Sequence, residues 1–338
     1  MTNGLVSELP AGIIQEKIYT YSQNDFGFSQ KLRLFRFLLF NASKFDIIHL
    51  LFTPTKSNIF FINLALAISG ARRKTRTIQT VATLREDIFS NQEIKKLMFS
   101  DLVITYSDYA KNKLEKLGIA NTKRIYPGID LDIYKPAPKD PEVLSKFNIQ
   151  ASEFVISYPG EYVRLGATDG LVEILPKLFE KIPNAKFIFA CRIKNEKDAK
   201  KKNEVIEKLR EHNLLEKVAF SDTFADVSKL YNLADVVVFP VGNMKGKFDV
   251  PLAVIEAMAC EKPVVISDIP ILQEFATAEN SAIIKNGDFS QLIDVLMGLS
   301  ADQESRKALG KSARKYVEMN FDIKNVSEEY KKAYESLN

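Results

Sequence analysis

The residues best suited to chemistry lie in one stretch, the loop Pro240–Lys247 followed by the segment Phe248–Cys260. The loop contains two glycines and two lysines. Pro251 suits the first turn of a helix, where its missing N–H costs nothing. The free N–H groups of such a turn favour anions. Glu256 comes more than one turn later and could face the same crevice, so the stretch predicts an anion site with a carboxylate beside it.

Two predicted strands position this stretch. Ala234–Phe239 is apolar and rich in β-branched residues, as expected of a strand buried on both faces. Lys262–Asp268 has the same character after the helix. Loops that follow the strands of a parallel sheet face the crevice in which ligands collect. The simplest alternative is a well-formed β-α-β unit that binds nothing.

The stretch resembles the nucleotide-sugar site of glycosyltransferases with the GT-B fold, specifically the large retaining group called family four. Glu-Ala-Met-Ala at 256–259, followed by Lys-Pro-Val-Val at 262–265, is close to the signature of that family. The resemblance implies that Glu256 binds the ribose or sugar hydroxyls of the donor. It also implies that the N–H groups near Leu252 and Ala253, just after Pro251, hold phosphate.

The resemblance fails at the family's earlier glutamate, which contacts the transferred sugar. That position is Phe248 in this chain, and the nearest acid is Asp249. We expect Asp249 to replace the lost carboxylate in part, and we count it with Glu256 and Arg164 as the candidate catalytic residues.

A second departure lies in the loop after the predicted strand Phe154–Tyr158. Relatives carry an arginine directly after the equivalent of Gly160 and a lysine five residues later, and these cations clamp the donor diphosphate. This chain has Glu161 and Gly166 there. Arg164 takes the clamp role in our interpretation, because a guanidinium holds phosphate oxygens bidentately. Lys247 would supply more charge from the other loop, and the alternative for Arg164 is an exposed loop arginine.

The resemblance implies a GT-B fold, α/β in class, with two Rossmann-like doubly wound parallel-sheet domains that face a cleft. Residues 1–136 would form an N-terminal acceptor domain, completed by the C-terminal helix 323–338. Residues 137–322 would form the donor domain. The family's first strand and glycine-rich loop are missing from the sequence, in which Ile13–Tyr21 is the first plausible strand.

The N-terminal half lacks a residue that relatives place near the reacting sugar. They carry a histidine where this chain has Ala82, so a general acid–base role is unavailable at that point. His49 lies inside the predicted strand Phe45–Phe52, which favours a histidine with satisfied hydrogen bonds over a catalytic one. Retaining transfer can proceed without such a base when the leaving diphosphate deprotonates the acceptor hydroxyl.

A predicted helix at 29–41 combines Lys31, Arg33 and Arg36 with many leucines and phenylalanines. The favoured interpretation is that its apolar face belongs to the core and its cations are solvated. The alternative is a basic, aromatic face that contacts anionic lipid. That contact would place the protein peripherally at the inner face of a membrane.

Bulk properties exclude several classes of protein. The net charge of +4 is too small to indicate a nucleic-acid binder. Cys191 and Cys260 lie in apolar runs, which indicates buried thiols in a reducing, cytoplasmic compartment. No Asp-x-Asp pair lies near the site, so we expect no divalent metal and no cofactor besides the nucleotide-sugar substrate.

Two functions remain open at this stage. The first is a retaining, hexosyltransferase-like enzyme that uses a nucleotide-diphosphate sugar and a glycan or lipid acceptor. The second is a catalytically impaired GT-B-like protein that binds a nucleotide sugar or supports a partner enzyme. The departures at Ala82, Phe248, Glu161 and Gly166 favour the second.

Overall fold

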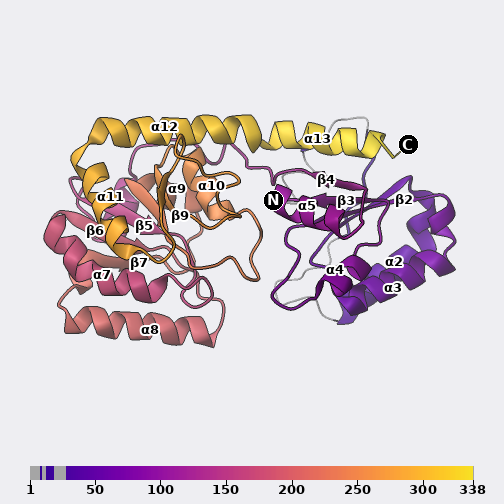
Figure 1. The fold of residues 1–338 in the computed structure, drawn as a ribbon, viewed down its shortest axis with the longest axis horizontal. Coiled ribbons are helices and arrows are strands. Elements are labelled where there is room, and N and C mark those ends of the chain that lie inside the picture. Colours follow the sequence, from indigo (N-terminus) through magenta and orange to yellow (C-terminus); the bar gives the residue numbers. More distant parts are fainter. Residues whose placement is uncertain (1–7, 10–12, 19–27, 338) are drawn as a thin grey trace. The chain divides into compact units, whose positions relative to one another are not determined.

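The computed structural model describes residues 8–9, 13–18 and 28–337 (Figure 1). The chain divides into two compact units, which we describe separately. The first ends at Gly128 and resumes at Lys324, and the second runs from Ile129 to Ile323. Among the described residues, no helix combines the length and the apolar character needed to cross a bilayer.

The first unit is built on a parallel sheet of four strands in the order β1-β2-β3-β4. Its strands are β1 (Ile47–Leu51), β2 (Arg76–Val81), β3 (Leu102–Thr105) and β4 (Thr122–Arg124). Its helices are α2 (Phe28–Asn41), α3 (Lys56–Ile68), α4 (Asn91–Leu97), α5 (Asp108–Lys116) and α13 (Ile323–Glu335), with short 3-10 turns η1 (Ala42–Lys44) and η2 (Ala71–Arg73).

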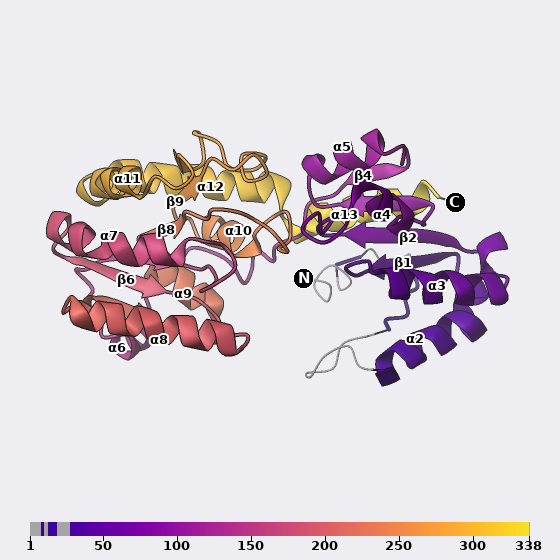
Figure 2. The same cartoon turned by 60° about the horizontal axis from the view of Figure 1, so that its bottom comes forward.

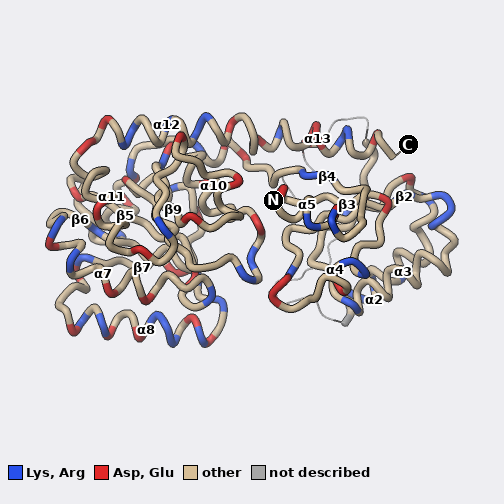
Figure 3. Tube along the Cα trace, in the orientation of Figure 1, with Lys and Arg blue, Asp and Glu red and all other residues tan. Residues whose placement is uncertain are grey.

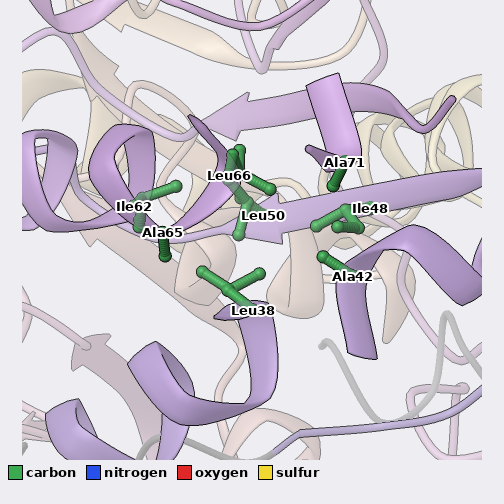
Figure 4. Close-up of a cluster of buried hydrophobic side chains, with 8 residues drawn as sticks. All are labelled: Leu38, Ala42, Ile48, Leu50, Ile62, Ala65, Leu66 and Ala71. Carbon is green, nitrogen blue, oxygen red and sulfur yellow. The ribbon is translucent and has the colours of Figure 1, made fainter. Parts of the chain in front are cut away.

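Alternation along the strands gives this sheet two buried faces. Ile48 and Leu50 of β1 point to α2 and α3, where they pack against Leu38 and Leu66 (Figure 4). The intervening residues face α13, which packs over β2, β3 and the residue after β4 through Val326, Tyr330 and Ala333. The C-terminal helix therefore belongs to the core of the first unit.

The second unit is a parallel sheet of six strands in the order β10-β9-β8-β5-β6-β7. Its strands are β5 (Phe154–Tyr158), β6 (Ala185–Phe189), β7 (Val218–Phe220), β8 (Val236–Phe239), β9 (Val264–Ser267) and β10 (Ala282–Ile284). Its helices are α6 (Pro141–Lys146), α7 (Thr168–Lys181), α8 (Glu196–Glu211), α9 (Val227–Leu233), α10 (Leu252–Ala259), α11 (Phe289–Ala301) and α12 (Gln303–Asn320), with η3 (Leu215–Lys217) before β7.

Helices cover both faces of this sheet. α7 contacts α8 and α11 on one side, whereas α9 contacts α6 and α10 on the other, and α12 packs on α10 (Figures 1 and 2). Strands β5, β8 and β9 are buried along their whole length, as the apolar runs predict. The predicted fold class, two Rossmann-like parallel-sheet domains, is confirmed.

Strand order in the second unit reverses between β5 and β8. From β5 the chain proceeds outward to β6 and β7, and it then returns to β8 and proceeds outward to β9 and β10. In open parallel sheets, ligands bind beyond the carboxyl ends of the strands at this point of reversal. The fold therefore predicts a ligand site at the loops after β5 and β8.

Two local expectations were wrong, and one short helix was not expected. Residues 13–18 of the predicted strand Ile13–Tyr21 form no strand, and residues 19–21 lie outside the described part. Residues 136–152 are rich in proline and charge, a composition typical of a linker, yet they contain α6, which the Asp140 side chain caps. Pro251 is the N-cap of α10 rather than a residue of its first turn, because its φ of −75° and ψ of 101° are extended.

His49 has a full set of hydrogen-bond partners under α13. One ring nitrogen lies 2.9 Å from the hydroxyl of Tyr334, and the other lies 2.7 Å from the hydroxyl of Thr80. The rings of Tyr330 and Tyr334 flank it, with centroids 5.6 and 5.7 Å away. Burial lowers the pKa of His49 from 6.5 to about 3. The neutral imidazole thus joins β1 and β2 to the C-terminal helix.

The buried histidine makes the free energy of unfolding depend on pH. Its pKa in the folded protein is depressed, so its contribution is complete above the unfolded pKa of 6.5 and is lost as pH falls toward 3. Wild type should lose about 1.4 kcal/mol per pH unit in this window through His49 alone. In urea unfolding between pH 7 and pH 4, His49→Gln should show a shallower slope than wild type. His212→Gln, at the exposed second histidine, is the control. Equal slopes for His49→Gln and wild type would contradict this assignment.

Candidate functional site

Two loops meet at the point where the strand order of the second unit reverses. The loop after β5 and the loop after β8 are joined by a hydrogen bond from the Gly242 amide to the Leu165 carbonyl, at 2.8 Å. Arg164 adds a second link, because its guanidinium donates to the Gly246 carbonyl at 2.9 Å. The loops that sequence reasoning selected separately therefore form one structure.

Glu161 is the centre of this structure. Its side chain is only 7% exposed, and three cations converge on it. Lys247 reaches one carboxylate oxygen at 2.7 Å, Lys194 contacts the same oxygen, and Arg164 lies 3.3 Å from the other. These cations come from the loops after β8, β6 and β5, which are neighbours in the sheet. We call these four residues the Glu161 cluster.

Opposing effects determine the charges in the Glu161 cluster. Burial alone would raise the pKa of Glu161, but hydrogen bonds from Lys194 and Lys247 outweigh it and hold the pKa below its usual value. Burial lowers the pKa of Lys247, and repulsion from Lys194 and Arg164 adds to this effect, whereas Glu161 opposes it. Glu161 is therefore an ionised carboxylate that holds mutually repelling cations together.

Glycines shape the loop after β5. A Cβ atom on Gly160 would lie 1.9 Å from the ring of Tyr158, so a larger residue does not fit without moving that ring. Gly166 has a φ of +74°, in the left-handed region that favours glycine. At Gly166, where relatives carry the clamp lysine, the backbone faces Gly242 and Asn243 of the other loop.

The N-terminus of α10 follows the loop after β8. The first hydrogen bonds within the helix are donated by Val254 and Ile255 to the carbonyl of Pro251. The amides of Leu252 and Ala253 precede them at the open end of the helix, where N–H groups favour an anion. Both residues are partly exposed. These two amide donors follow Lys247, a member of the Glu161 cluster, by only a few residues along the chain.

Glu256 lies in the second turn of α10 and contacts a different part of the unit. Its carboxylate accepts a hydrogen bond from the hydroxyl of Tyr231 at 2.8 Å and another from Tyr134. Burial raises the pKa of Glu256, and these two hydroxyls oppose the rise. Since Glu256 is partly exposed, its carboxylate is positioned by tyrosines rather than sealed in the core.

The remaining candidates differ in exposure. Asp249 is buried at 5% exposure, whereas Phe248, which stands where the family has its earlier glutamate, is 42% exposed. Lys245, the other lysine of the loop after β8, is exposed and lies outside the Glu161 cluster. In the described part of the chain, no group of three or more His, Cys, Asp or Glu residues could hold a metal ion.

The structure brings some predicted residues together and adds one that sequence reasoning missed. Arg164, Lys247 and Glu161 meet, whereas Glu256 has its own tyrosine partners. Lys194 was missed because it lies in a charged run before α8. The available signal was its place after β6, because loops after adjacent parallel strands converge at one edge of the sheet. Asp198 also accepts from the Lys194 amide at 3.2 Å, which fixes the backbone there.

The Glu161 cluster predicts a specific effect of removing the carboxylate. Glu161→Ala should lower the free energy of unfolding by about 2 kcal/mol, because three cations would lose their shared anion. Phosphate or sulfate should recover part of that loss by occupying the vacated position. Urea unfolding without phosphate and with about 20 mM phosphate would measure the loss of stability and its recovery.

The matched control is Glu304→Ala, which removes the exposed partner of Lys307. It should change stability by less than about 0.5 kcal/mol and show no special response to phosphate. An unchanged stability in Glu161→Ala, or an equal phosphate response in the two variants, would show that the cations do not depend on Glu161.

Comparison with known proteins gives a consistent result. The family model described as glycosyl transferases group 1 matches residues 140–316, just over half of the chain. The capsular polysaccharide biosynthesis glycosyltransferase CapM of Staphylococcus aureus is 25% identical over 70% of this chain, and the match spans 58% of CapM. The putative glycosyltransferase YtcC of Bacillus subtilis is 25% identical over 88% of this chain and 74% of its own length.

A solved structure shows the same fold. HepE of Anabaena, crystallised in complex with UDP and glucose, has a TM-score of 0.76 and 18% identity, covering 94% of this chain and 85% of HepE. Its fold is the GT-B fold inferred from the sequence. With a family match across the six-stranded unit that carries the Glu161 cluster, this chain belongs to the glycosyl transferases group 1 family.

Proposed function

We propose that this protein is a retaining glycosyltransferase of family four that moves a hexosyl group from a nucleoside-diphosphate sugar to a hydroxyl of a glycan or lipid acceptor. The observation that supports this most directly is the Glu161 cluster, at the strand reversal of the six-stranded sheet. Three cations against one carboxylate leave an excess of positive charge. A diphosphate carries the complementary charge.

In this proposal Arg164, Lys194 and Lys247 hold the diphosphate together with the amides of Leu252 and Ala253. The side chains of these cations are 45%, 28% and 27% exposed, so each is in part accessible to solvent. Glu161 is a positioning residue, because it is buried behind them and keeps them close together before the donor arrives. Gly160 allows the loop that carries Glu161 and Arg164 to pass close to the ring of Tyr158.

The chemical step then requires little from the protein except electrostatics. The bond between the anomeric carbon and the diphosphate oxygen breaks. A new bond to the acceptor oxygen forms on the same face of the sugar, and the acceptor proton passes to the departing diphosphate. Because Ala82 provides no base, catalysis depends mainly on the cations, which stabilise the negative charge that develops on the leaving diphosphate.

Glu256 would bind the ribose or sugar hydroxyls, and Asp249 would approach the transferred sugar from the loop before α10. The hydroxyls of Tyr231 and Tyr134 orient the Glu256 carboxylate, so it is preorganised for such a contact. Since HepE was crystallised with UDP and with UDP-glucose, uridine nucleotides are the first donors to test. The name of CapM makes a polysaccharide precursor the first acceptor class to test.

A second function has specific support. The exposed Phe248 and the absent histidine at Ala82 favour a protein that binds a nucleotide sugar without transferring it. Both functions need the same donor site, so binding and turnover must be measured separately.

The donor site is tested by titrating UDP and several nucleoside-diphosphate sugars calorimetrically. Lys194→Met, Lys247→Met and Arg164→Met should each weaken diphosphate binding about tenfold to a hundredfold, because each removes a charge-assisted hydrogen bond. Lys197→Met is the matched control, since Lys197 is an exposed lysine just beyond the loop, and it should leave the affinity unchanged.

Glu256 is tested by Glu256→Gln, which retains an acceptor for Tyr231 and should preserve the fold. We expect weaker binding of complete nucleotides and an unchanged affinity for inorganic pyrophosphate, which lacks hydroxyls. Equal affinity of wild type and variant for every nucleotide would remove Glu256 from the site.

Turnover decides between the two functions. Transfer or hydrolysis of a bound donor, with the product anomer retained, would support the enzyme. Tight donor binding with no turnover across a broad acceptor panel would support the binding protein. Failure of wild type to bind any diphosphate nucleotide would contradict both.

A further inference from the structure

Helix α3 has an apolar face on the side away from its own core. Ile59, Ile62, Ala65 and Leu66 are buried against the first unit. The opposite face carries Phe60, Phe61, Leu64 and Ile68, which are 62%, 54%, 38% and 62% exposed. A surface helix normally places polar residues there, and a helix that is apolar all round is buried in protein or in lipid.

The exposed face continues onto α2. Phe61 packs edge-to-face on Phe35 of α2, with ring centroids 6.3 Å apart. Leu32 and Phe40, two turns apart on α2, are 44% and 65% exposed. The inner face of α2 meets the core through Leu38, so core packing accounts for one side of the helix only (Figure 4). The two helices together present one apolar surface.

The segments that carry this surface are rich in cations and poor in acids. From residue 28 to residue 85 the chain has ten lysines and arginines and a single acid, Asp46, although the whole protein carries only +4. Exposed cations include Arg33 and Arg36 on α2 and Arg72 and Arg73 in η2, beyond the end of α3. Figure 3 shows blue segments on α2 and at the turn after α3. Exposed phenylalanines bordered by arginines match the boundary between acyl chains and anionic headgroups.

We propose that the α2–α3 surface docks the protein on an anionic lipid bilayer. The surface consists of Leu32, Phe40, Phe60, Phe61, Leu64 and Ile68 with the bordering cations Lys31, Arg33, Arg36, Arg72 and Arg73. The apolar side chains insert at the acyl boundary, and the cations bind lipid phosphates. The proposal takes up the alternative interpretation of the helix at 29–41 and extends it to α3. It does not depend on the donor site, which belongs to the other unit.

The test is co-sedimentation of the full chain with phosphatidylcholine vesicles that contain either no phosphatidylglycerol or about 30% of this anionic lipid. We expect binding to the anionic vesicles only, and loss of binding at high salt because the cations are screened. Phe60→Ser combined with Leu64→Gln should weaken binding at least tenfold. Arg33→Gln combined with Arg36→Gln should weaken it roughly twenty-five-fold, about fivefold per charge.

The matched control variants make the same kinds of substitution at exposed positions outside the α2–α3 surface. Ile88→Ser with Met319→Ser removes exposed apolar side chains, and Lys197→Gln with Lys200→Gln removes exposed cations from α8. Both should bind like wild type. Sedimentation velocity without lipid shows whether the protein self-associates, as it would if a second copy bound this surface.

Three results would overturn the proposal. They are no binding to anionic vesicles at low salt, equal loss in the control variants, and self-association of wild type that Phe60→Ser with Leu64→Gln abolishes. The last would assign the surface to a second copy. Loss of vesicle binding in the surface variants, with unchanged donor affinity, would support the proposal whether or not the protein transfers sugar.

Discussion

The donor site proposed here depends on one buried carboxylate. Glu161 is nearly inaccessible to solvent, yet it is ionised because Lys194, Lys247 and Arg164 surround it. Without it, three cations in adjacent loops would repel one another in a partly desolvated place. With Glu161 present, the three cations form a compact group that has a net positive charge. A change that removes a cation from the family pattern thus creates the anion around which other cations gather.

The sheet explains why those cations meet. Loops after β8, β5 and β6 lie next to one another because the strands do, and the strand order reverses between the first two. Apolar runs predicted β5, β8 and β9, and all three are buried strands. Local polar contacts were harder to predict. Lys194 belongs to a charged run with no pattern of its own, and only the tertiary pairing of β5 with β6 brings it to Glu161.

Sequence reasoning was weakest in the first unit and at helix starts. Residues 13–18 have strand-like composition but form no strand, because propensity without a pairing partner does not fix a strand. Short α6 depends on a single cap, Asp140, inside a segment whose prolines and charges resemble a linker. The exposed face of α3 was also hidden in sequence, where an apolar helix next to a buried strand looks like core. Only the structure separates its buried side from its exposed side.

The central claim is that a diphosphate binds the cations now held by Glu161. A crystal structure of the protein with a bound nucleoside diphosphate tests it most directly. The account predicts phosphate oxygens within hydrogen-bonding distance of Lys247, Arg164 and Lys194, and of the amides of Leu252 and Ala253. A nucleotide bound elsewhere, with all three cations still directed only at Glu161, would contradict it.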